Sequence, residues 1–127
     1  MMRKKSIKSE TTHNGTLNTL VRLSQMTVDD EDFYATEKVA KEVFKTMAEV
    51  YNPSQKDIVI MQSKGIKSAI TLKMRDPLGE YIPKNADTVI IEDKHFADKR
   101  WNIADIRPDL KDNRYLVILL DGGERNG

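Results

Sequence analysis

Apolar residues in the second half of the chain recur in short groups that turn-forming residues separate. Alternation is clearest over residues 69–74, where Ile70, Leu72 and Met74 share one side and polar residues occupy the other. This alternation indicates a strand with one buried face. The remaining groups predict short strands over residues 88–92, 101–106 and 115–120. Four such strands are typical of a small antiparallel β-barrel or sandwich, so we expect a mainly β fold.

The first half of the chain contains one clear strand and one ambiguous element. Residues 17–28 predict a strand with Val21 and Leu23 on one face. Residues 39–51 fit two structures, since some of their apolar residues recur at helical spacing and others fit one face of a strand. The spacing by itself favours a helix. Pro53 ends the element in either case, because proline restricts the residue before it.

Residues 54–65 predict a short helix of about two turns, or a long loop that becomes ordered on assembly. Ser54 is placed to cap the start of a helix, and Gly65 is placed to end one. Between them, residues 58–61 form an apolar run that is unusual for a loop in permanent contact with water.

With 127 residues, the chain has the length of a single domain. We expect a flexible basic arm over residues 1–15, one β-barrel domain over residues 16–121 and a polar tail over residues 122–127. Cysteine is absent, which excludes disulfides, thiol nucleophiles and thiolate zinc sites. No apolar run approaches the length of a membrane span, so we expect no membrane partner. The predicted strands should supply the core residues Leu72, Trp101, Ile103 and Ile118.

The ionisable residues do not form a recognisable catalytic site. His13 and His95 are far apart in the sequence, and an acid–base or metal cluster of His95 with Asp93 and Asp98 has no further ligand pattern to support it. The four acids at residues 29–32 lack the alternation and glycine of a calcium loop, so they indicate an exposed loop. We therefore expect no enzymatic activity, no metal and no cofactor.

Residues 64–75 carry four basic side chains and no acid. Lys67, Lys73 and Arg75 fall on the same side of an extended strand and could line one polar face. No aromatic residue in this stretch could stack on a base, so a solvated strand face explains the pattern better than nucleic-acid recognition does.

A series of short motifs follows in order along the chain, including the pattern W-x-I-x-x-I over residues 101–106. The other motifs span residues 21–25, 44–50, 66–75, 81–83, 87–91 and 115–120. Their order resembles the phage head–tail joining family, which includes the head-closure or stopper proteins of long-tailed bacteriophages. The acidic residues 29–32, in place of a glycine-rich turn, and the basic N-terminus differ from the family pattern.

The resemblance implies a structural subunit. Six or twelve copies would form a homo-oligomeric ring at the head–tail interface of the virion, between the portal with its adaptor and the tail, after synthesis in the host cytoplasm. The ring would retain packaged DNA through non-specific contacts and receive the tail. Two alternatives remain open at this point, a tail-side completion or terminator protein and a small nucleic-acid-binding β-barrel.

The resemblance also assigns structure and roles to particular segments. It implies a strand over residues 43–51, against the helical spacing, followed by a gating loop over residues 53–67 that becomes ordered in the ring. The loop residues expected to face the DNA channel are Lys56, Ile58, Ile60, Lys64 and Lys67.

Overall fold

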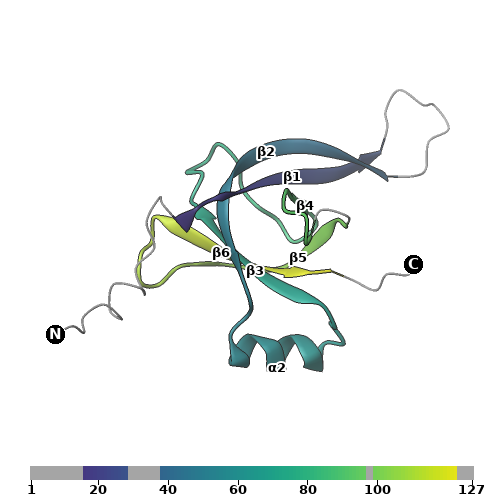
Figure 1. The fold of residues 1–127 in the computed structure, drawn as a ribbon. Coiled ribbons are helices and arrows are strands. Elements are labelled where there is room, and N and C mark those ends of the chain that lie inside the picture. Colours follow the sequence, from purple (N-terminus) through teal and green to yellow (C-terminus); the bar gives the residue numbers. More distant parts are fainter. Residues whose placement is uncertain (1–15, 29–37, 97–98, 123–127) are drawn as a thin grey trace.

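Six antiparallel strands close into a barrel in the order β1-β2-β3-β6-β5-β4 (Figure 1). A helix, α2 (Gln55–Ser63), joins the second strand to the third. The mainly β fold and the strands expected from alternation are thereby confirmed. The strands are β1 (Thr19–Val28), β2 (Lys38–Tyr51), β3 (Ala69–Arg75), β4 (Thr88–Ile91), β5 (Trp101–Pro108) and β6 (Tyr115–Asp121).

The computed structural model describes residues 16–28, 38–96 and 99–122. The basic arm predicted over residues 1–15, the acidic loop at 29–32 and the greater part of the predicted tail lie outside these residues. Gly122, where that tail was expected to begin, still belongs to the barrel, because its backbone N–H donates to the carbonyl oxygen of Ser68 at 2.8 Å.

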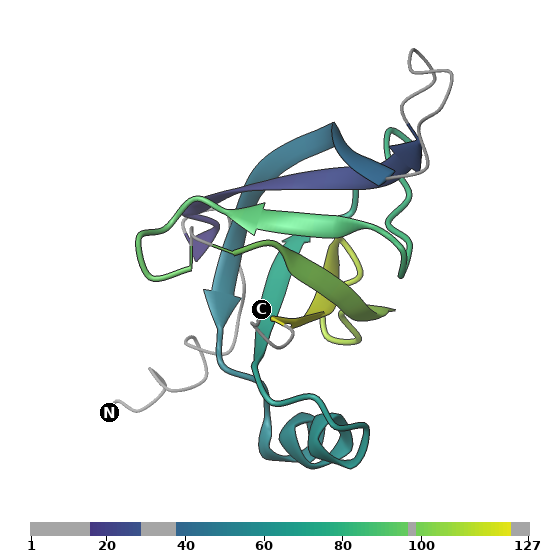
Figure 2. The same ribbon diagram turned by 90° about the vertical axis from the view of Figure 1, so that its right-hand side faces the viewer.

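Apolar side chains from all six strands fill the barrel interior, which the strands surround in Figure 2. β6 is buried on both faces, as its continuous apolar run indicated, since Ile118 and Leu119 point to opposite sides and are 0% and 2% exposed. The structure also buries the residues that the strand patterns assigned to the core, and their exposed fractions are 4% or less: Leu72, Trp101, Ile103 and Ile118.

β2 resolves the ambiguity over residues 39–51 in favour of a strand. It pairs with β1 from Lys38 to Ala48 and with β3 from Ala48 to Tyr51. A β-bulge interrupts the first pairing, because Leu23 lies opposite Phe44 while Ser24 lies opposite Glu42. The extra residue, Val43, shifts the alternation of the strand by one position. The apolar residues on either side of the bulge therefore do not keep a period of two, and their spacing resembles that of a helix.

Candidate interaction surface

One face of α2 is anchored to the barrel. The helix begins at Ser54, whose Oγ accepts the backbone N–H of Asp57 at 3.1 Å, which confirms the predicted cap. The buried carboxylate of Asp57 accepts a hydrogen bond from Arg107 on β5, with 3.0 Å between Nη2 and Oδ1. Met61 lies one turn later and is 3% exposed. Since Asp57 and Met61 are four residues apart, they fix the same face of the helix.

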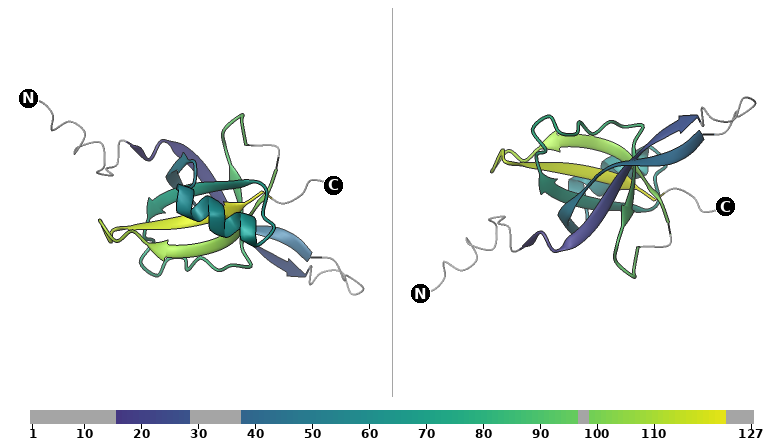
Figure 3. Two further views of the ribbon diagram at one scale, coloured as in Figure 1. Left: turned by 90° about the horizontal axis from the view of Figure 1, so that it is seen from below. Right: turned by 90° about the horizontal axis from the view of Figure 1, so that it is seen from above.

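Two large apolar side chains on the outward side of α2 are exposed to water. Val59 is 57% exposed and Ile60 is 41% exposed. Figure 3 shows, in the view from below, that α2 lies across one side of the barrel and that no other strand or helix of the described residues covers it. Exposed apolar side chains grouped on a helix that is fixed on its other face are typical of a contact surface for a partner.

The structure distributes the five residues expected to face a DNA channel along and just beyond α2. Lys56 and Ile60 are exposed, whereas Ile58 faces the barrel and is half-buried. Lys64 and Lys67 are exposed on the connection between α2 and β3. In the single chain, the segment expected to be a gating loop, residues 53–67, is a helix with a defined end rather than a long loop. Gly65 adopts φ +80°, and its N–H donates to the carbonyl oxygen of Gln62 at 3.0 Å.

Two open clefts lie beside α2. One, of about 330 Å³, separates α2 from the ends of β2 and β3, and its lining includes Pro53, Ile58 and Met61. The other, of about 350 Å³, lies between the start of α2 and the turn that joins β5 to β6, and its lining includes Tyr51 and Thr71. Both clefts are open grooves between packed elements.

The second cleft contains polar groups that are partly removed from water. The Thr71 hydroxyl is buried and has no hydrogen-bond partner among the described residues. Partial burial, together with the nearby carboxylates of Glu49 and Asp109, raises the pKa of the Tyr51 hydroxyl from 10.0 to about 12, and Arg107 opposes this shift. Tyr51 is neutral at physiological pH, as a tyrosine with an ordinary pKa also is.

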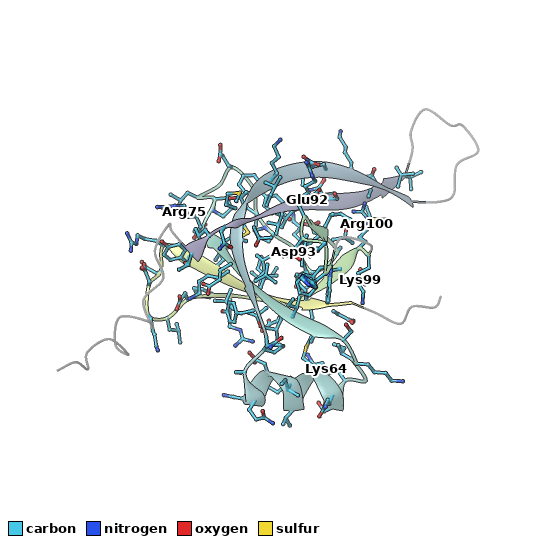
Figure 4. The ribbon with its side chains drawn as sticks, in the orientation of Figure 1. Lys64, Arg75, Glu92, Asp93, Lys99 and Arg100 are labelled. Atoms are coloured by element: carbon cyan, nitrogen blue, oxygen red, sulfur yellow. The ribbon has the colours of Figure 1, made fainter. Side chains whose placement is uncertain are left out.

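The basic residues 64–75 do not converge on one patch. Lys73 lies against Asp109, with 3.0 Å between Nζ and Oδ2 and both side chains largely buried. The Arg75 guanidinium lies over the ring of Tyr115, 5.8 Å from its centroid. Figure 4 shows Lys64 beside α2 and Arg75 on the other side of the barrel. The basic residues therefore do not form the single polar face expected from strand alternation. Lys73 takes part in an ion pair, Arg75 in a cation–π contact, and Lys64 lies at the end of α2.

His95 contacts Asp93 in an exposed turn. The Nδ1 atom of His95 lies 2.9 Å from Oδ1 of Asp93, and the imidazole is 71% exposed. Backbone and side-chain hydrogen bonds from His95 lower the pKa of Asp93. Asp98, the third residue of this candidate cluster, lies outside the described residues. Within residues 16–28, 38–96 and 99–122, no three histidine or acidic side chains group as metal ligands.

A buried polar pair in the β3–β4 connection had no signal in the sequence. The Tyr81 hydroxyl donates to the carboxylate of Asp87, and the backbone N–H of Lys84 donates to the same oxygen at 3.1 Å. Burial, together with this carboxylate, raises the pKa of Tyr81. The Tyr81 ring stacks on Phe44 of β2 with 5.2 Å between centroids. These contacts fix the connection against β2, so their role is structural.

Other large apolar side chains are exposed away from α2. Leu78 and Ile82 in the β3–β4 connection are 86% and 64% exposed, and Leu110 in the β5–β6 turn is 94% exposed. Single exposed apolar residues are ordinary. Their presence at several loop tips nevertheless adds to the surface that a neighbouring subunit could cover. Within the part of the chain that the structure describes, no helix is long and apolar enough to cross a membrane.

Comparison with known proteins defines the fold only. The sequence matches no known protein family and no curated protein. Among solved structures, the barrel is similar to the solution structure of a protein from Shigella flexneri 2a, determined as a structural genomics target, with a TM-score of 0.66 and 15% sequence identity. The similarity covers 91% of this chain and 100% of the other. Two proteins that differ this much in sequence therefore share an overall fold.

Proposed function

We propose that this protein is a non-enzymatic structural subunit of a phage head–tail connector. Copies of the barrel form a homo-oligomeric head-closure ring between the portal with its adaptor and the tail, at the head–tail interface of the virion. The ring retains packaged DNA and provides the docking site for the tail. The order of the sequence motifs supports this proposal, and the closed barrel with its helix between β2 and β3 is compatible with it.

The observation that carries the proposal is the exposed apolar face of α2. Val59 and Ile60 remain exposed although the helix is anchored by Asp57 and Met61, so the single chain does not cover them. Burial of apolar area contributes about 25 cal/mol per Å². A ring places the same face of each copy beside its neighbour, where this contribution is gained once per interface.

The basic residues near α2 suit the proposed contact with DNA. Lys56 and Lys64 are exposed at the two ends of the helix, and Lys67 follows on the connection to β3. Lysines contact phosphates without reading the base sequence. Packaged DNA of any sequence could therefore pass a ring whose channel these residues line.

A double variant on the exposed face tests the proposal. We expect the wild-type chain to form a closed oligomer, seen by light scattering and native mass spectrometry. Val59→Asp with Ile60→Asp should remain monomeric, and its unfolding free energy should change by no more than about 0.5 kcal/mol. Asn85→Asp is the matched control, because Asn85 is exposed in the β3–β4 connection and not on α2, so its substitution should leave assembly intact.

Two outcomes would contradict the proposal. The first is assembly of the double variant at the wild-type concentration, which would show that the exposed face of α2 is not a subunit contact. The second is a monomer that binds oligonucleotides with an affinity that falls steeply as salt rises, which would instead favour a nucleic-acid-binding barrel.

A further inference from the structure

β2 is much longer than the strand that pairs with its outer edge. It has 14 residues, and β3 pairs only with the last four, Ala48–Tyr51. Residues 38–47 are paired with β1 on one side only. No backbone hydrogen bond from a turn or loop of the described residues reaches this second side. Residues 38–47 therefore present an unpaired strand edge.

β1 has a matching unpaired edge. β4 pairs only with residues 21–24 of β1, so residues 25–28 are paired solely with residues 38–41 of β2. These two segments form a two-stranded unit, here called the ribbon, in which both outer edges are open. Figures 1 and 3 show that the ribbon extends away from the barrel beyond β4.

The ribbon has the properties of an element completed by another strand. A two-stranded antiparallel pair is at best marginally stable in water, and an open edge carries unpaired N–H and C=O groups that can template a further strand. Its side chains are also incompletely covered, since Val28 is 44% exposed and Val39 is 46% exposed. The two valines point to opposite faces, because Val28 lies opposite Lys38 and residues 38 and 39 alternate.

We propose that the β2 edge of each ribbon pairs antiparallel with the β1 edge of the ribbon in a second copy of this chain. This inference rests on the proposed ring. A contact between two different edges is head-to-tail, so it repeats from copy to copy and can close into a ring. A contact between two β2 edges would instead be two-fold and would end at a dimer. The sheet thus continues from subunit to subunit through main-chain hydrogen bonds.

Hydrogen exchange on the unassembled and assembled protein tests the pairing. In the monomer, every second amide of residues 38–47 points away from β1 and should exchange rapidly. In the closed oligomer, those amides that lie within the ribbon, residues 38–41, should become protected, with exchange slowed about tenfold for each 1.4 kcal/mol of added stability. The amides of β3 that pair with β6 serve as internal controls and should not change.

Mixed single-cysteine proteins provide a second test, and the chain is suited to it because it contains no native cysteine. Residues 28 and 40 share one face of the ribbon, and residue 42, the next but one along β2, lies on the same face of that strand. Val28→Cys protein should therefore form disulfides with Ala40→Cys or Glu42→Cys protein under mild oxidation, since paired strands bring Cα atoms within disulfide range. Ala86→Cys, an exposed residue of the β3–β4 connection, is the control and should not cross-link with Val28→Cys.

The outcomes separate this inference from the proposed function. A closed oligomer in which residues 38–41 stay unprotected and the mixed proteins do not cross-link would overturn the ribbon pairing and leave the ring in place. Equally strong cross-linking of Ala40→Cys protein to itself, in a particle with the mass of a dimer, would contradict the head-to-tail geometry. A monomer at every concentration, without cross-links, would contradict the ring and the pairing together.

Discussion

The barrel interior and the surface formed by α2 and the ribbon differ in how completely their apolar side chains are buried. Leu72 and Ile118 are completely buried within a closed sheet, and each strand of that sheet contributes to the core. On α2 and the ribbon, by contrast, Val59, Val28 and Val39 are each more than 40% exposed. The barrel covers its own core, whereas these projecting elements retain apolar side chains and strand edges that no other part of the described residues covers.

This difference separates two effects of mutation. A substitution within the barrel should lower the stability of the single chain. It leaves a cavity or an unpaired polar group, and the surrounding side chains can relax around it only in part. A change on the projecting elements should alter assembly and leave the stability of the single chain nearly unchanged. Substitutions in the two regions therefore test whether folding and association are carried by different residues.

The largest effect on folding is expected for Trp101→Ala. The ring is 3% exposed, packs edge-to-face on Phe96 at 6.0 Å between centroids, and lies 4.7 Å from Nζ of Lys99. Its removal should cost about 3–5 kcal/mol of unfolding free energy, measured by urea denaturation. A loss below about 1 kcal/mol would show that the barrel core does not depend on this side chain.

Tyr81→Phe should have the next largest effect. The substitution keeps the ring stacked on Phe44 but removes the hydroxyl that donates to the buried carboxylate of Asp87. Asp87 is then left with the backbone N–H of Lys84, and the loss should be about 1–3 kcal/mol. An unchanged midpoint and slope in denaturant would contradict a role for this pair in holding the β3–β4 connection.

Ser54→Ala should cost about 0.5–2 kcal/mol, because the N–H of Asp57 loses its side-chain acceptor at the start of α2. Ser54→Asp is the matched control, since aspartate also caps helices well. Chemical denaturation followed by circular dichroism measures both variants. Equal stability of the alanine variant and the wild type would mean that the anchored face alone maintains the helix.

The smallest effect is a change in pH dependence at Tyr51. Burial raises the pKa of its hydroxyl from 10.0 to about 12, so the folded chain retains a proton that the unfolded chain releases in this interval. The stabilisation is complete below pH 10 and is lost as pH rises through about 12. Tyr51→Phe should lose less stability over that interval than the wild type does. Identical slopes for the two proteins would contradict the raised pKa.

The sequence predicted most of the strands because their core-facing apolar residues recur at every second position, as Val21 and Leu23 do in β1 and Trp101 and Ile103 do in β5. β3 is the clearest case, since Ile70, Leu72 and Met74 alternate with polar residues and all three are buried. Alternation could not identify β2, because the bulge at Val43 changes which residues face the core halfway along the strand. Only pairing with β1, a contact between distant parts of the chain, settles its structure.

The candidate surface was only partly visible in the sequence. The apolar run at residues 58–61 and the cap at Ser54 pointed to α2, but which of these residues face outwards depends on the ion pair between Asp57 and Arg107. That pair joins residues that are 50 positions apart. The open edge of β2 was not predictable either, because a strand edge is defined by the partner strand that ends beside it and not by its own side chains.

Cryo-electron microscopy of the assembled protein is the decisive test of the proposed connector ring. We expect a closed ring with cyclic symmetry, in which the exposed face of α2 is covered by the neighbouring copy and Lys56 and Lys64 lie beside the channel. Particles with two-fold symmetry alone, or a ring in which α2 faces outwards into solvent, would contradict it.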